Sequence, residues 1–238
     1  DMRNYGGLIK KLPIAFWSMI IGTLSITGVG IPLSYDLFHL PFGFSGFVSK
    51  DAILEGMFAS KSYSSLGSFW FLLFAAFITT LYSWRLIILT FFGPPRGNLE
   101  YYEQAQERSN TINITLISLA LGSLIVGVIF FDTFLGKGSD DFFSESLFVD
   151  SSNHVLHDLH SIPYWAKMAP FVGMLVACSA AWICFFWRPN ISRDFAHNQN
   201  ILYKFFANKW YFDEIYEYLL VKPARWLGYK FWKIGDEK

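Results

Sequence analysis

The stretch "GFSGFVSKDAILEGMF", residues 43–58, places a lysine and an aspartate at the start of a helix-like run inside an otherwise apolar segment. These residues are Lys50 and Asp51. Charged side chains are costly in apolar surroundings, so either the two lie in water or they are the functional reason for the segment. The rest of the sequence helps to decide between these readings.

The composition indicates a membrane protein. Of the 238 residues, 53% are hydrophobic, 20% are aromatic and only 16% are charged, whereas soluble domains carry about 25% charged residues. The formal net charge is zero, so no nucleic-acid partner is expected. Cys178 and Cys184 lie six apart in one apolar run and are expected to act as small apolar filler. The chain starts at Asp1 without a basic-then-apolar signal sequence, and we expect this start to lie within a longer protein.

Four uncharged runs are long enough to cross a bilayer, which takes about 20 mostly apolar residues. They are residues 12–35, 62–84, 109–131 and 168–187. The sequence therefore predicts an all-α membrane protein with about four transmembrane helices, the first broken, followed by the start of an amphipathic, lateral helix. The predicted segments are a loop (1–11), a broken span (12–58), three further spans (62–92, 109–131 and 168–187), a loop (132–167) and a tail (188–238).

Lysines and arginines are concentrated in alternate connections. Three precede the first span, three follow the second and nine follow the last. The other connections hold only Lys61 in one case, and Lys137 and Lys167 in the other. The positive-inside rule then puts both ends of the chain on the matrix or cytoplasmic side. The loop 132–167, with its six acidic residues, faces outside in this arrangement.

The first predicted span is too long to be one straight helix. Residues 12–49 number 38 and would form a helix of about 57 Å, against a hydrocarbon core of about 30 Å. Glycine and proline favour breaks at "GVGIP" (28–32) and "PFGFSG" (41–46). Backbone groups freed at membrane depth must be satisfied by protein or water, so a broken helix with an ionisable residue is a candidate ion pathway.

Lys50 and Asp51 are the predicted proton-transfer residues. If Ser49 caps the following helix, Lys50 lies in its first turn, where the helix dipole disfavours a second positive charge. Partial burial also disfavours the ammonium, whereas Asp51 favours it, so a passing charge could switch this lysine. In the alternative reading, residues 12–31 cross alone and Lys50 lies at the outer interface with its ammonium in water.

Three other features are candidate sites. His39 lies in the predicted break and is either a proton relay or a structural hydrogen-bonding group. Arg85 follows the second uncharged run and either anchors the span at the matrix side or holds a carboxylate of the proton route. Three histidines in the outer loop could bind zinc, although spacings of three and six residues drift around a helix; they are His154, His157 and His160. The chain shows no phosphate loop, dinucleotide fingerprint or iron–sulfur cysteine cluster, and no cofactor or metal is expected in it.

The tail predicts an interfacial amphipathic segment, lying along a membrane surface or a neighbouring helix. Apolar residues recur there at helical spacing, namely Phe212, Ile215, Tyr216, Leu219 and Leu220. Pro223 is expected to interrupt the helix, after which basic residues alternate with aromatic ones.

Four segments carry a resemblance to a known family. They are "DMRNYGGLIKKLP" (1–13), "GFVSKDAILE" (46–55), "LYSWRLIILTFFG" (81–93) and "NKWYFDEIYEYLLVKPARWLG" (208–228). In this order they resemble the C-terminal part of chain 5 of NADH:ubiquinone oxidoreductase, the distal antiporter-like subunit of respiratory complex I. The Ser-Lys-Asp element and the tail are the most specific of these segments.

The resemblance implies a subunit of a proton-translocating translocase that couples quinone reduction to proton pumping and carries no redox chemistry itself. It implies that Lys50 is the lysine of the broken helix in the second of two inverted repeats, part of a lateral chain of charged groups, with Asp51 beside it. NADH, FMN, iron–sulfur clusters and ubiquinone are then expected in other subunits. The implied partners are lipid, the other membrane-arm subunits, especially the neighbouring antiporter-like subunit, and a chain carrying the N-terminal half. The implied location is the mitochondrial inner membrane or, alternatively, the bacterial plasma membrane.

The family's charged residues of the first repeat and most of its lateral helix have no counterpart here, so we expect a split or partial subunit. Two other functions remain open from the sequence. One is a subunit of a multisubunit sodium/proton antiporter, which shares the broken-helix design. The other is a non-conducting brace of the membrane arm that docks through its tail.

Overall fold

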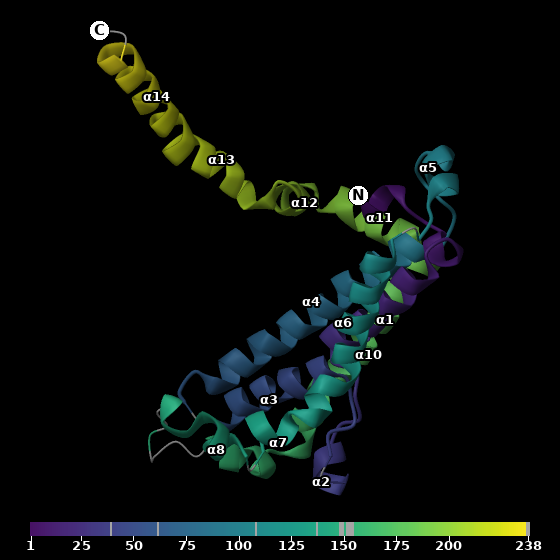
Figure 1. Ribbon diagram of the computed structural model, residues 1–238, viewed down its shortest axis with the longest axis vertical. Coiled ribbons are helices and arrows are strands. Elements are labelled where there is room, and N and C mark those ends of the chain that lie inside the picture. The colour runs from purple at the N-terminus through teal and green to yellow at the C-terminus, as the bar shows by residue number, and fades with distance from the viewer. Residues whose placement is uncertain are drawn as a thin grey trace. The chain divides into compact units, whose positions relative to one another are not determined.

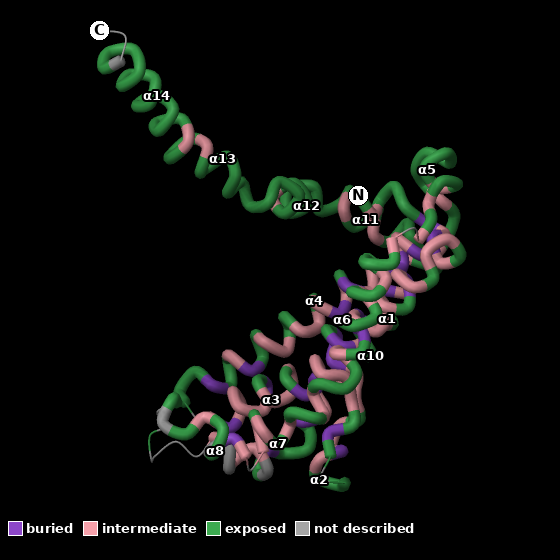
Figure 2. The backbone as a smooth tube through the Cα atoms, viewed as in Figure 1, coloured by how far each residue is buried: buried purple, intermediate pink, exposed green. Residues whose placement is uncertain are grey.

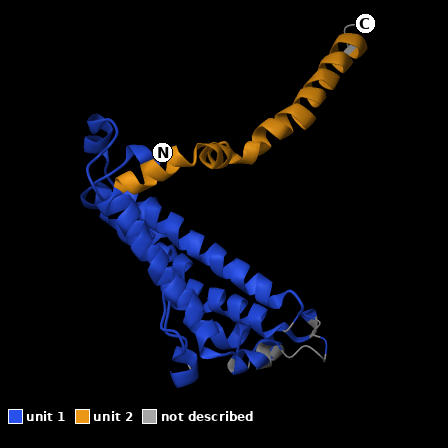
Figure 3. Cartoon of the chain, turned by 180° about the vertical axis from the view of Figure 1, so that it is seen from behind, with its two compact units in different colours: residues 1–188 blue, residues 189–238 orange. Residues whose placement is uncertain are grey.

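The protein is described from a computed structural model, which describes residues 1–38, 40–60, 62–107, 109–136, 138–147, 150 and 155–236. In this part of the chain all regular elements are helices, and the strand-like feature is a single bridge between Gly30 and Gly43. The prediction of an all-α membrane protein is therefore confirmed. The chain divides into two compact units, residues 1–188 and residues 189–238 (Figure 3).

The first unit contains ten α-helices among its described residues (Figure 1). They are α1 (Pro13–Thr27), α2 (Ser34–Phe38), α3 (Ser45–Ala59), α4 (Ser65–Phe91), α5 (Leu99–Gln104), α6 (Asn110–Ile129), α7 (Phe131–Phe134), α8 (Ser139–Phe143), α9 (Val155–Asp158) and α10 (Tyr164–Trp182). A π-helical turn, Ile183–Trp187, extends α10.

Three helices of the described chain are long and apolar enough to cross a membrane: α4, α6 and α10 with its extension. The first predicted span is divided between α1 and α3, which contain 15 residues each. A helix of that length is about 22 Å long, so α1 alone is too short for a hydrocarbon core of about 30 Å. This length disfavours the reading in which the first apolar run crosses by itself.

The two short helices lie end to end along α4 and α6, since each of them packs against both long helices. At one end, Phe16 of α1 packs in a buried apolar cluster with Ile87 and Phe91 of α4. At the other end, Leu54 of α3 is buried with Phe69 of α4. Because Phe69 lies near the start of α4 and Phe91 at its end, α1 and α3 together run the length of α4.

The start of α1 is fixed by a carboxylate from a distant part of the chain. Pro13 begins the helix, and the residue before it, Leu12, offers no side-chain cap. Instead the backbone amide of Ala15 donates to Oε1 of Glu107, 92 residues away, at 2.9 Å. A carboxylate at a helix N-terminus satisfies a free amide and opposes the helix dipole.

The fourth span begins earlier than the sequence predicted. Its helix α10 starts at Tyr164, rather than at residue 168, so Lys167 lies inside the helix and is buried. Lys167 is therefore not a charge of the connecting loop.

The second unit is a helical segment with almost all of its described residues exposed (Figure 2). Its helices are α11 (Pro189–Asn198), α12 (Asn200–Ala207), α13 (Phe212–Tyr216) and α14 (Lys222–Phe231). Pro223 does not interrupt the helix as expected, because it lies in the first turn of α14 after a π-helical turn, Glu217–Val221. A proline in the first turn needs no donor, and the wider turn before it accommodates the ring.

Candidate functional site

The break after α1 is made by Gly28. Its φ of 78° is left-handed, a conformation that favours glycine. The amides of Gly28 and Val29 donate to the carbonyls of Ser25 and Leu24, at 3.0 and 2.9 Å. This hydrogen-bond pair is the Schellman motif, which ends a helix. The carbonyl of Thr27 is then left to find a partner outside α1.

The segment between α1 and α3, the two half-helices of the broken span, leaves the helix axis and returns to it. Gly30 and Gly43 form an antiparallel bridge, with the amide of Ile31 donating to Phe42 at 2.7 Å and that of Phe44 donating to Val29 at 3.0 Å. The return places the start of α3 beside the end of α1. Helix α3 therefore begins at Ser45, four residues before the Ser49 cap that the sequence suggested.

Small residues and hydroxyls hold this junction together. A Cβ on Gly46 would lie 2.1 Å from the carbonyl oxygen of Ser25, so a side chain there is excluded. The amide of Gly46 donates to Oγ of Ser25 at 3.0 Å. On the other side, Oγ of Ser45 donates to the carbonyl of Gly122 at 3.1 Å and accepts from the amide of Gly127 at 2.8 Å. The broken span is thus pinned to α6 at the break.

Lys50 lies directly at this junction. Its Nζ donates to the carbonyl oxygen of Thr27 at 3.1 Å, and its aliphatic stem lies against Gly28. Thr27 is almost completely buried, and Lys50 is half-buried. Lys50 occupies the second turn of α3 rather than the first. The charge it meets is therefore the negative end of the α1 dipole, which provides an acceptor for an ammonium.

A row of charged side chains continues from Lys50 along α3. Asp51 interacts electrostatically with Lys50 and with Glu55, which lies one turn further on the same helix face. Glu55 interacts in turn with Lys167 of α10 and Asp36 of α2. Lys167 and Asp36 form an ion pair, with Nζ and Oδ2 at 2.7 Å. We call Lys50, Asp51, Glu55, Lys167 and Asp36 the charged row.

Sequence reasoning did not single out Glu55, Lys167 or Asp36. The position of Glu55 four residues after Asp51 was a usable signal, because residues at this spacing share a helix face. No local signal could have paired Lys167 with Asp36, since 131 residues separate them.

Of the other candidate residues, Arg85 is described by the structure and is not part of the charged row. The guanidinium of Arg85 lies 5.5 Å from the ring centroid of Phe185, a cation–π contact between α4 and the extension of α10. His39 and His154 lie outside the described residues, as do the side chains of His157 and His160. Among the described residues no group of three potential ligands could hold a metal ion.

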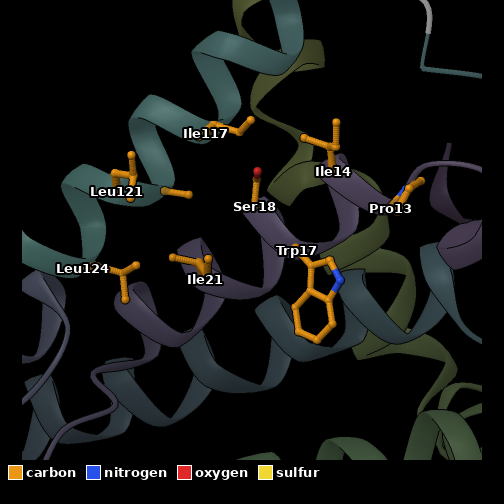
Figure 4. Close-up of a pocket in the computed structure, with 9 residues that line it drawn as sticks. Pro13, Ile14, Trp17, Ser18, Ile21, Ile117, Leu121 and Leu124 are labelled. Atoms are coloured by element: carbon orange, nitrogen blue, oxygen red, sulfur yellow. The ribbon is translucent and has the colours of Figure 1, made fainter.

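An apolar cavity of about 290 Å³ opens between α1 and α6 (Figure 4). Its lining is entirely uncharged and includes Trp17, Ile21 and Leu121. The lining of this cavity contains no acidic or basic side chain, so the charged row remains the candidate site.

Proteins similar to this chain carry two related names. A protein of Rhodobacter capsulatus, "NADH-quinone oxidoreductase subunit L", is 35% identical over 99% of the chain. A protein of Rickettsia felis with the same name is 32% identical over 100% of it. A protein of Acanthamoeba castellanii, "NADH-ubiquinone oxidoreductase chain 5", is 34% identical over 93% of it.

The chain spans only part of these relatives, namely 40%, 36% and 31% of their respective lengths. No protein-family model matches the chain.

Proposed function

We propose a function from one premise, that the chain is homologous over nearly its whole length to a part of subunit L, or chain 5, of NADH–quinone oxidoreductase. The proposed function of the chain is to take part in proton translocation by that complex. In this proposal it is the C-terminal part of an antiporter-like subunit of the membrane arm. The observation that supports this most strongly is the placement of Lys50, whose ammonium meets the end of a half-helix at the break in a span. A charged group at such a break is expensive in a membrane and is typical of ion pathways.

The proposed mechanism is electrostatic. A change of charge upstream in the complex alters the free energy of the Lys50 ammonium, which then releases or accepts a proton through water at the broken helix. The carbonyl of Thr27 holds the ammonium in place. Asp51, beside it, adjusts its affinity for the proton and begins the route along α3. The loop carrying α2 returns to the junction, where it would keep lipid away from Lys50 in this proposal.

The remaining roles are proposed in the same way. Electron transfer would take place in other subunits, which would hold NADH, FMN, iron–sulfur clusters and ubiquinone. The partners would be lipid, the neighbouring membrane-arm subunits and a polypeptide carrying the first repeat. The location would be the mitochondrial inner membrane or a bacterial plasma membrane, with both ends of the chain on the matrix or cytoplasmic side.

Replacing Asp51 tests this proposal in the assembled complex. In Asp51→Asn the route loses the carboxylate between Lys50 and Glu55, and we expect the proton-transfer step to slow about tenfold, which corresponds to about 1.4 kcal/mol in its barrier. The measurement is NADH-driven acidification of vesicles in sodium-free medium, together with the rate of NADH oxidation by an artificial acceptor. We expect slower acidification with the oxidation rate unchanged.

The matched control is Asp141→Asn, in which an exposed aspartate of α8 is changed and both rates should stay at the wild-type level. Wild-type acidification that requires sodium would instead assign the chain to a sodium/proton antiporter. Full acidification by the assembled Asp51→Asn complex would contradict the proposed route.

A further inference from the structure

The far end of the charged row joins three elements that are distant in the sequence. Glu55 lies on α3, Lys167 on α10 and Asp36 on α2. The Lys167 side chain is only 7% exposed, and its Nζ lies 2.7 Å from Oδ2 of Asp36, whose side chain is 31% exposed. Glu55 interacts electrostatically with both of these partners. The cluster thus leads from the half-buried Glu55 toward a more exposed carboxylate.

Lys167 lies beside an apolar cluster in the sequence and the fold. Its neighbour Ala166 is buried in one cluster with Leu54 of α3, Phe69 of α4 and Ile162. A buried ion pair is weak evidence of stabilisation, because taking two charges out of water costs about as much as their attraction returns. The burial of Lys167 next to this cluster therefore points to a role other than holding α10 to α2.

Glu55 interacts with one positive and one negative side chain. Lys167 attracts its carboxylate, whereas Asp36 repels it. Protonation of Glu55 would remove its attraction for the Lys167 ammonium while the ion pair with Asp36 remains, and deprotonation would restore the competition between these two carboxylates. The protonation state of Glu55 is thus coupled to an ion pair between α2 and α10.

We infer that Glu55 carries the proton after Lys50 and Asp51, and that Lys167, held by Asp36, is the positioning residue that promotes its release. This inference rests on the proposed function. The Glu55 carboxylate accepts a proton from the protonated carboxyl group of Asp51, which becomes a carboxylate, or from hydronium, which becomes water, and an O–H bond forms on Glu55. That bond then breaks, the proton leaves to water as hydronium, and the ammonium of Lys167 stabilises the carboxylate that remains.

The test compares variants of the assembled complex for protons translocated per NADH oxidised. Glu55→Gln and Lys167→Gln should lower this ratio as much as Lys50→Met does in the same preparation. Glu55→Asp and Lys167→Arg should recover it, because the first keeps a carboxyl group and the second keeps the positive charge. The matched controls, Glu100→Gln and Lys10→Gln, change exposed residues and should leave the ratio unchanged.

A double variant separates this role from a purely structural one. Asp36→Asn with Lys167→Gln removes both charges of the ion pair, so neither residue is left as a charge without its partner, and the complex should assemble even where Lys167→Gln alone does not. We expect the double variant to remain deficient in protons per NADH, because Glu55 has lost its ammonium. A normal ratio in the double variant would overturn the role of Lys167.

The outcomes also distinguish this inference from the proposed function. A normal ratio in assembled Glu55→Gln, with a lowered ratio in Lys50→Met, would overturn the inference and leave the proposed function standing. A normal ratio in all of these variants, Lys50→Met included, would overturn both.

Discussion

Replacing Lys50 with methionine is expected to abolish the share of proton translocation that passes through this chain. Methionine is close to lysine in length and packs well in irregular apolar sites, so α3 should keep its place along α4 and α6 while the ammonium on the Thr27 carbonyl is lost. Protons translocated per NADH should fall by this subunit's whole share. NADH oxidation by an artificial acceptor, which needs no proton route, should remain at the wild-type rate.

Lys50→Arg shows whether proton translocation needs only a positive charge at position 50 or also the release of its proton. Arginine keeps the positive charge and can still donate to Thr27, but it does not lose its proton at accessible pH. If Lys50 only anchors the end of α1, this variant should translocate normally. Our account predicts a deficit like that of Lys50→Met, and an unchanged ratio with full assembly of both variants would refute the role of Lys50.

A methyl group on Gly46 is expected to open the junction of the half-helices. The Cβ of Gly46→Ala would lie 2.1 Å from the carbonyl oxygen and 2.7 Å from the carbonyl carbon of Ser25. Both are backbone atoms, so α1 and α3 must move apart, and overpacking of this kind costs about 1–3 kcal/mol or more. We expect at least a fivefold loss of assembled complex on native gels, and slower translocation by what remains, because Lys50 moves away from Thr27.

The matched control is Gly22→Ala on the same broken span. No atom lies within 4 Å of a Cβ built on Gly22, and alanine favours helix over glycine by about 1 kcal/mol. The control should therefore assemble at least as well as the wild type. Equal assembly of Gly46→Ala and Gly22→Ala would show that the junction is not as tight as described.

The fold was largely predictable because its signals are local. Apolar runs of sufficient length predicted the long helices. The stretch 28–32 predicted a break, and the structure ends α1 at Gly28, whose φ is left-handed. The start of α3 was misplaced for a tertiary reason. Its first turn is positioned by contacts of Ser45 with α6 and of Gly46 with α1. No local sequence pattern predicts either contact.

The candidate site was predictable only at its first two members. Lys50 and Asp51 stand out as charges within an apolar run. Lys167 was misread as a loop charge, because the residues before it look polar and aromatic rather than membrane-spanning, yet α10 begins at Tyr164. Its partner Asp36 lies on an excursion of the chain whose path is set by the bridge of Gly30 to Gly43. Pairing of that kind depends on tertiary structure.

The central claim is that Lys50 lies within the membrane at a break that admits water, and thiol labelling at position 50 tests it most directly. Lys50→Cys would be made in a chain whose Cys178 and Cys184 are replaced by alanine. Two further variants of that chain serve as controls, Lys10→Cys at an exposed position outside the spans and Val172→Cys on the apolar helix α10.

We predict that the thiol of the Lys50→Cys variant reacts with a small charged thiol reagent but not with a maleimide on a large polymer. The Lys10→Cys variant should react with both reagents, and the Val172→Cys variant with neither. Reaction of the Lys50→Cys variant with both reagents would place residue 50 in bulk solvent. Reaction with neither reagent would show that water does not reach it. Either result would contradict the account.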